Sequence, residues 1–214
     1  MKKLFRLCTV IAIITSVIAI FNSCGPSTVI TGTWDREDTS EQYDDVLIAA
    51  LINNVNMKSK LEEAVVRAMS EKEVKASESI DFIPTKFIED NDQKSKIIDM
   101  IRKNGNDAIV SLVIVEKDTE TRYIPERGRY APYHHFHYYR SFWNYYDHWR
   151  YHFDRSDYYT EQDVYYIETN VYDADSEELV WSAQSKTYEM ANFENFAEDF
   201  ANKIVEKLDS ENII

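Results

Sequence analysis

The first 24 residues decide which part of this chain folds and where that part resides. They consist of a basic start, an uncharged apolar run over residues 7–21 and a short polar stretch that ends at Cys24. These are the three regions of a secretory signal. The apolar run is shorter than the roughly 20 residues that a membrane-spanning helix needs. We therefore predict that residues 1–23 are removed and that the protein is exported.

Cys24 stands at the expected cleavage point, and the polar, helix-breaking residues 25–27 follow it. Here the chain resembles bacterial lipoproteins, whose signal ends in a small residue and a cysteine that becomes the acylated first residue. Phe21 and Asn22 depart from the commonest residues of that motif. The resemblance implies a covalent lipid, palmitate included, on Cys24. It also implies an outer-membrane lipoprotein with a periplasmic or surface face, because no acid follows the cysteine. The alternatives are an ordinary signal peptide with an incidental cysteine, or an uncleaved anchor helix.

The net charge limits which molecules the protein can bind, and the positions of the two cysteines bear on lipid attachment and disulfides. The formal charge is −14 at pH 7, and the signal holds only cations, so the exported part is more acidic still. This charge argues against binding nucleic acid or adsorbing to anionic lipid. Contact with the membrane would come from the lipid anchor, at about 0.8 kcal/mol per buried methylene. Neither cysteine calls for a disulfide, since Cys8 leaves with the signal and Cys24 would carry lipid.

Composition divides the exported chain into three parts. Residues 24–45 are polar and acidic and predict a solvated tether, although Val29, Ile30 and Trp34 could pair onto a sheet edge. Residues 46–210 predict one domain, and residues 211–214 a short tail.

Hydrophobic periodicity predicts a mixed α/β fold with about five strands and about three helices. Its start is a parallel strand–helix–strand unit, its end is an antiparallel hairpin, and Asn56 is the expected cap of the first helix. Gly105 suits the left-handed position after the second helix. The expected strands are residues 46–52, 74–80, 108–115, 164–173 and 179–188, and the expected helices begin at 56, 92 and 192.

The expected hairpin carries a second resemblance. Residues 173–183 read Asp-x-x-Ser-x-x-Leu-Val-Trp-x-Ala, and an amphipathic helix follows. This segment is similar to the hairpin of several envelope lipoprotein families of unknown function that have a small α/β sandwich fold. The similarity implies that fold and the lipoprotein class but transfers no activity. Leu179 and Trp181 are expected to face inward together as alternate strand residues.

Residues 123–163 depart from ordinary composition. They hold most of the tyrosines, all five histidines and two of the four tryptophans, with arginine but no lysine. One interpretation is an amphipathic helix over residues 141–153 whose aromatic stripe packs on the sheet. Another is a recognition surface for a protein or glycan partner, because Tyr, Trp and Arg are typical of interface centres. The candidate binding residues are Tyr138, Tyr139, Trp143, Tyr145, Tyr146 and Trp149.

Histidine spacing in the same insertion offers a third interpretation. His134, His135 and His137 lie close together in sequence, and His148 and His152 would share one face of a helix. Both spacings suit zinc or copper, because imidazole binds both metals and no thiolate competes. No cofactor is otherwise expected.

The chain shows no recognisable catalytic motif. Its four glycines, at positions 25, 32, 105 and 128, exclude the glycine-rich phosphate loops and the G-x-S-x-G elbow. We therefore expect a non-enzymatic, membrane-anchored envelope lipoprotein whose insertion faces outward and binds a protein or glycan partner. The alternatives are a histidine-based zinc or copper protein and a structural subunit of an envelope assembly.

Overall fold

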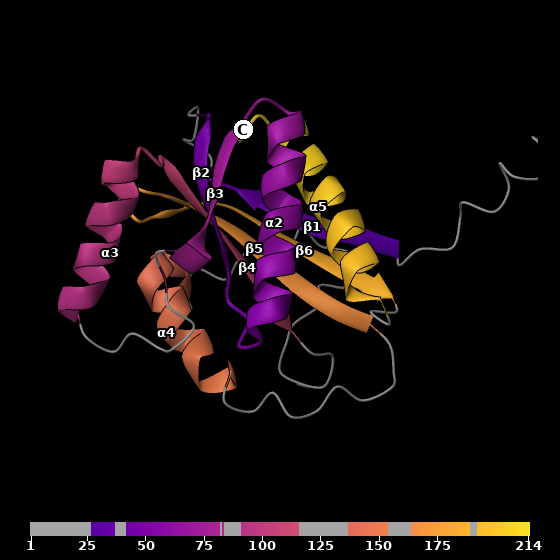
Figure 1. Ribbon diagram of the computed structural model, residues 1–214, viewed down its shortest axis with the longest axis horizontal. Coiled ribbons are helices and arrows are strands. Elements are labelled where there is room, and N and C mark those ends of the chain that lie inside the picture. Colours follow the sequence, from indigo (N-terminus) through magenta and orange to yellow (C-terminus); the bar gives the residue numbers. More distant parts are fainter. Residues whose placement is uncertain are drawn as a thin grey trace, which may run out of the picture.

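The computed structural model describes residues 27–36, 42–81, 83, 91–115, 137–153, 164–188 and 192–214. The predicted signal, Cys24, His134 and His135 lie outside these residues. The described chain forms three layers, with two helices on each face of a central sheet (Figure 1). No helix among the described residues has the length and apolar character required to cross a membrane.

The sheet has six strands in the order β1-β6-β5-β4-β2-β3. Strand β2 pairs in parallel with β3 and β4, and the remaining pairs are antiparallel. The mixed α/β prediction is confirmed, with one strand more than expected. The strands are β1 Ser27–Asp35, β2 Asp45–Ala50, β3 Lys75–Glu78, β4 Ala108–Val115, β5 Val164–Asp173 and β6 Leu179–Tyr188.

Two helices that run side by side cover one face of the sheet, α2 (Val55–Glu71) and α5 (Phe193–Ser210) (Figure 1). Asn54, not the expected Asn56, caps α2, because its side chain accepts hydrogen bonds from two backbone N–H groups of the first turn. The apolar stripes of both helices pack on alternate residues of the strands. Phe196 and Phe200 are fully buried there, and each such side chain stabilises the fold by roughly 1.5–3 kcal/mol.

The other face is covered by α3 (Asn91–Asn104) and α4 (Phe142–Phe153). Gly105 ends α3 with φ +93°, as predicted. Helix α4 confirms the aromatic helix expected over residues 141–153, and its stripe packs against β5, β6 and neighbouring strands. The buried aromatic residues of this layer are Tyr139, Phe142, Trp143, Tyr145, Tyr146, Trp149 and Tyr172. Two 3₁₀ turns, η1 (Ser79–Asp81) and η2 (His137–Arg140), complete the described elements.

Residues 27–35 were expected to belong to a solvated tether, and that prediction is wrong. They form strand β1, which pairs with β6 from Ser27 opposite Tyr188 to Asp35 opposite Trp181. The sequence already allowed Val29, Ile30 and Trp34 to pair onto an edge. A bulge between Ile30 and Gly32 breaks the register, as is common in edge strands. The sheet therefore starts three residues after Cys24.

The expected C-terminal tail is instead part of the core. Ile213 is 4% exposed, and its carbonyl accepts a 2.9 Å hydrogen bond from the backbone N–H of Tyr43. Glu211 receives hydrogen bonds from the side chains of Thr33 and Trp181. The end of the chain thus holds β1, β6 and the segment before β2 together.

Leu179 and Trp181 do not share a face, contrary to the prediction. A register shift in the β5–β6 pairing sets Val171 opposite Trp181 and Tyr172 opposite Leu179. The extra residue reverses the alternation, so Trp181 packs under α2 and α5, whereas Leu179 packs with α3 and α4.

A buried ion pair ties α2 to the sheet. The Nζ atom of Lys58 lies 2.6 Å from Oε1 of Glu62, and both side chains are at most 4% exposed. Glu62 also accepts hydrogen bonds from the N–H groups of Ala50 and Ile80 and from the hydroxyl of Ser79. Ser79 lies beside Lys58, and a serine next to a lysine can form a catalytic pair. Here both side chains are buried in the core, away from any substrate. The cluster is therefore a structural lock.

Candidate functional site

A polar cleft lies at the end of the sheet where β2 and β4 begin and β5 turns into β6. We call this the acidic end. The cleft has a volume of about 390 Å³ and is open to solvent. The lining residues come from the segment before β2, the α3–β4 loop and the β5–β6 turn. They are Gln42, Tyr43, Arg102, Gly105, Asn106, Asp107, Asp173 and Asp175.

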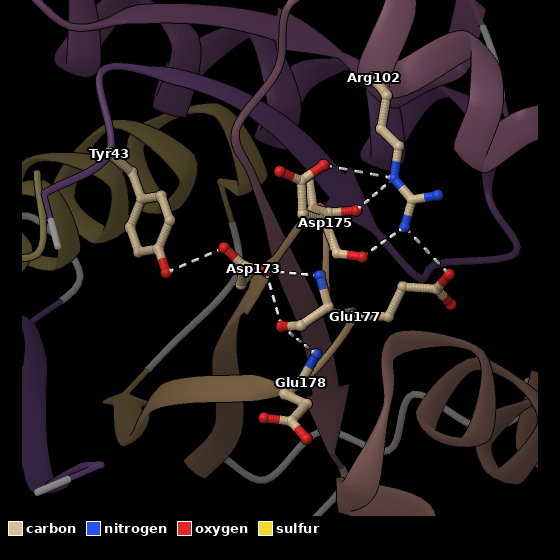
Figure 2. Close-up of polar contacts among 8 residues, drawn as sticks. Tyr43, Arg102, Asp173, Asp175, Glu177 and Glu178 are labelled. Carbon is tan, nitrogen blue, oxygen red and sulfur yellow. Dashed lines mark hydrogen bonds and ion pairs between the residues drawn. The ribbon is translucent and has the colours of Figure 1, made fainter. Parts of the chain in front are cut away.

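Arg102, from the last turn of α3, holds one wall of the cleft in place. Its Nε donates to the carbonyl of Ala174 at 2.8 Å, and its Nη2 donates to the carbonyl of Asp175 at 2.6 Å (Figure 2). The same Nη2 lies 3.5 Å from Oε1 of Glu177. Most of the N–H donors of the guanidinium are therefore occupied by hydrogen bonds to the β5–β6 turn.

Asp173 organises the same turn from its first position. Its Oδ1 accepts from both the backbone N–H and the hydroxyl of Ser176 at 2.6 Å (Figure 2). Its Oδ2 lies 3.5 Å from the hydroxyl of Tyr43. Glu177 has φ 59°, a left-handed conformation that costs free energy in a non-glycine residue. The turn thus depends on side-chain hydrogen bonds to keep its shape.

Asp107 forms the opposite wall. Burial raises the pKa of its carboxyl above the ordinary value, although the N–H groups of Asp44 and Asp45 donate to the carboxylate and oppose the rise. Asn106 is buried beside it and donates to Asp45 at 2.9 Å. The cleft therefore gathers acids whose positions are set by backbone and amide groups.

The chemistry of the cleft suits recognition of a polar or cationic group. Its one guanidinium is already paired, and the rest of the lining combines three carboxylates with two amides and one phenol hydroxyl. Among the residues that the structure describes, no three His, Cys, Asp or Glu side chains are grouped so as to hold a metal ion.

The six aromatic residues predicted to bind a partner are mostly placed in the core. Five of them are between 0% and 9% exposed and face the sheet from η2 and α4, namely Tyr139, Trp143, Tyr145, Tyr146 and Trp149. The side chain of Tyr138 lies outside the described part of the chain. A binding role for the five would require α4 to leave the sheet, and that role stays a prediction.

Of the five histidines, the structure describes the side chain of His148 alone. His148 lies on α4 and is partly exposed, with its ring edge-on to Trp149 at 5.4 Å. The backbones of His137 and His152 belong to η2 and α4, but their side chains lie outside the described residues. The zinc or copper prediction stays open.

A buried polar network beneath α4 was not predicted. Tyr145 donates to Oε1 of Glu168 at 3.0 Å, Asn170 donates to the same atom, and Ser182 donates to Asn170. All four residues are at most 4% exposed. Glu168 and Asn170 alternate with apolar or small residues along β5, but nothing in that pattern showed that a helix would cover their face.

The fold and this geometry define a three-layer, mixed α/β domain with an acidic cleft at one end of its sheet. Neither a protein-family model nor a curated protein matches the chain. Among solved structures, the PelC dodecamer from Paraburkholderia phytofirmans is similar with a TM-score of 0.43 and 11% identity, covering 86% of this chain and 96% of that one. A variant of the same dodecamer gives 0.42 and 11%, covering 84% and 95%. Likeness of this degree carries no argument about function or assembly.

Proposed function

We propose that this protein is a non-enzymatic lipoprotein of the cell envelope, held in the outer membrane by a covalent lipid on Cys24. The observation that carries the proposal is the junction between signal and fold. The basic, apolar and polar regions of a signal end at Cys24, and a folded strand begins at Ser27. A cleavage point this close to the first strand removes the signal and leaves the whole body intact.

The body provides a rigid platform for recognition of a partner. Its three layers are closed by the packed C-terminus and by the buried pair Lys58 and Glu62. The cleft at the acidic end brings polar groups together around an open volume of about 390 Å³, against about 200 Å³ for a second polar cleft between α2 and α5. We propose that a polar or cationic group of an envelope protein or glycan binds there. The aromatic insertion remains the second surface proposed for such a partner.

The lipid anchor is tested by comparing the wild type with Cys24→Ala in the native envelope. Cells fed a palmitate analogue with a clickable tag should label the wild type in the membrane fraction. The Cys24→Ala variant should lose the label and either reach the soluble fraction or accumulate with its signal attached. Cys8→Ala is the matched control and should behave as the wild type. A membrane-bound, lipid-labelled Cys24→Ala variant would show that the anchor is elsewhere.

Recognition by the cleft is tested separately, in the soluble form that begins at Gly25. Crosslinking in envelope extract from an Asn104→Cys label, next to the cleft-lining Gly105, should capture a partner. An equivalent label at Asn202, in the second cleft between α2 and α5, should not capture it. Capture of the same proteins by both labels would contradict a specific site at the acidic end.

A further inference from the structure

We infer that the anchored protein stands end-on, with the end of the sheet that carries Ser27 against the bilayer and the acidic end pointing away from it. This inference rests on the proposed lipid at Cys24. It assigns a membrane-facing surface to described residues, and its partner is the phospholipid headgroup layer.

The strand registers show which residues share the end of Ser27. Ser27 pairs with Tyr188, and Tyr188 pairs with Val164. Neighbouring strands lie about 4.8 Å apart, so Ser27 and Val164 are separated by roughly 10 Å. Strand β4 runs the opposite way to β5 and ends here with Val115, opposite Tyr166. We call this end of the sheet the anchor end.

The length of chain between the lipid and the body sets the distance to the membrane. Three residue steps join Cys24 to Ser27, and a fully extended chain spans at most about 10 Å over that length. Strand β1 runs from Ser27 for nine residues, or roughly 25–30 Å, towards Asp35 at the acidic end. A lipid at Cys24 therefore holds the anchor end within reach of the headgroups, while β1 can carry the other end well clear of them.

Charge favours the end-on orientation over one that lies flat. The β5–β6 turn at the acidic end contains four acids in six residues, Asp173 to Glu178. At the anchor end, residues 52–57 contain none, and Val55 is 49% exposed. Anionic headgroups repel the β5–β6 turn but do not repel the uncharged residues 52–57.

The anchor end is not free of acids, but they are fewer than at the acidic end, and at both ends some acids are paired with cations. Asp81, Asp92, Glu194 and Asp199 lie at the anchor end. Lys60 reaches Glu194 at 3.3 Å, and Asp199 accepts a 2.9 Å hydrogen bond from the backbone N–H of Thr28. Val29, in the third position of β1, is 44% exposed on the same end.

A body lying on the side of α5 would meet a less favourable surface. The outer side of α5 presents Glu198, Glu206 and Asp209 to solvent. Pressing that side against anionic lipid would add repulsion that the end-on orientation avoids.

The orientation changes the expected role of the insertion. Val115 and Val164 flank the region that contains it, and both lie at the anchor end. The insertion was expected to face outward, but the chain leaves and re-enters the sheet on the side of the lipid. The cleft at the acidic end is the part presented away from the membrane.

Two labels on one helix test the orientation. The mature chain has no cysteine besides Cys24, whose thiol the lipid would block, so an introduced cysteine is the sole free thiol. Asn56→Cys and Ser70→Cys lie at opposite ends of α2, are both exposed, and are about 21 Å apart along the helix axis. Each lipidated variant, with a fluorophore on its thiol, is reconstituted in phosphatidylethanolamine and phosphatidylglycerol vesicles that carry a headgroup quencher.

We expect quenching at position 56 to exceed that at position 70 by a factor of about three or more, given their axial separation. Flotation with the vesicles separates the two ways of failing. If the protein floats but position 70 is quenched as strongly as position 56, or more strongly, the orientation is wrong while the anchor stands. If the protein does not float and carries no lipid, the proposed anchor is wrong and the orientation falls with it.

Discussion

The indole Nε1 of Trp181 donates a 2.6 Å hydrogen bond to Oε2 of Glu211. Trp181 is fully buried under α2 and α5, and Glu211 follows the last turn of α5. The bond therefore ties the C-terminal residues to the middle layer of the fold. Lys207 and Thr33 reach the same carboxylate from α5 and β1. Glu211 is the point where the edge strand nearest the proposed anchor meets the end of the chain.

Glu211→Gln should destabilise the protein by about 1–3 kcal/mol at neutral pH, because the bonds from Trp181, Lys207 and Thr33 reach a charged acceptor. Burial raises the pKa of Glu211, but those three bonds outweigh it and lower the pKa below its ordinary 4.5. The ionised Glu211 carboxylate therefore stabilises the folded state fully above about pH 4.5. This stabilisation is lost as the pH falls through the pKa of Glu211 in the folded state. Urea unfolding should show a constant difference from pH 7 to 5 and a shrinking one below pH 4.5. The control Glu206→Gln, exposed on α5, should show little difference.

Lys58→Met should destabilise the protein by about 3–5 kcal/mol, because it leaves the Glu62 carboxylate buried without its counter-charge. The matched control is Lys60→Met on the same helix. Lys60 and its partner Glu194 are 48% and 68% exposed, so losing that pair should cost less than about 1 kcal/mol. Equal losses for the two variants in urea unfolding would contradict the structural lock.

Phe142→Ala should cost about 3–5 kcal/mol, since Phe142 is fully buried at the start of α4. Met100→Ala, on the neighbouring α3 and 47% exposed, should cost less than about 0.5 kcal/mol. Deletion of residues 130–159 should abolish cooperative unfolding, because it uncovers the polar network of Glu168. A deletion variant that still unfolds cooperatively at the wild-type midpoint would show that α4 does not contribute to the stability of the fold.

Arg102→Ala should loosen the β5–β6 turn and widen the cleft. The variant loses the bonds to the carbonyls of Ala174 and Asp175, a loss of about 1–2 kcal/mol for a partly exposed side chain. Amide hydrogen exchange at Ser176 and Glu178 should become faster, while exchange in α5 stays unchanged. The control is Lys103→Ala, the exposed next residue of α3. Unchanged exchange in the turn would mean that Asp173 alone maintains it.

Hydrophobic periodicity predicted the helices and strands correctly where an element buries a continuous apolar stripe. The stripe of α5 from Phe196 to Leu208 is buried as predicted, and the apolar strand β4 has the expected bounds. These elements form because a helix or strand with one such pattern has few ways to bury it. The same reasoning placed the aromatic stripe of α4 on the sheet.

The misses share a physical cause, which is pairing between residues far apart in sequence. Ser27 to Asp35 reads as polar linker until β6 provides a partner for its backbone groups. The bulge that separates Leu179 from Trp181 leaves no mark in an alternating sequence. The cleft was missed because Tyr43, Arg102 and Asp173 meet only once the sheet is assembled. In the sequence, the one indication of the cleft was that acidic residues stand at the ends of strands that neighbour each other in the sheet.

Intact mass measurement of the protein extracted from native membranes tests the lipid on Cys24 most directly. We expect a chain that starts at Cys24 and carries the added mass of acyl groups, with fragmentation placing that mass on the first residue. A chain that starts at Met1, or a cleaved chain whose Cys24 has a free thiol, would contradict it.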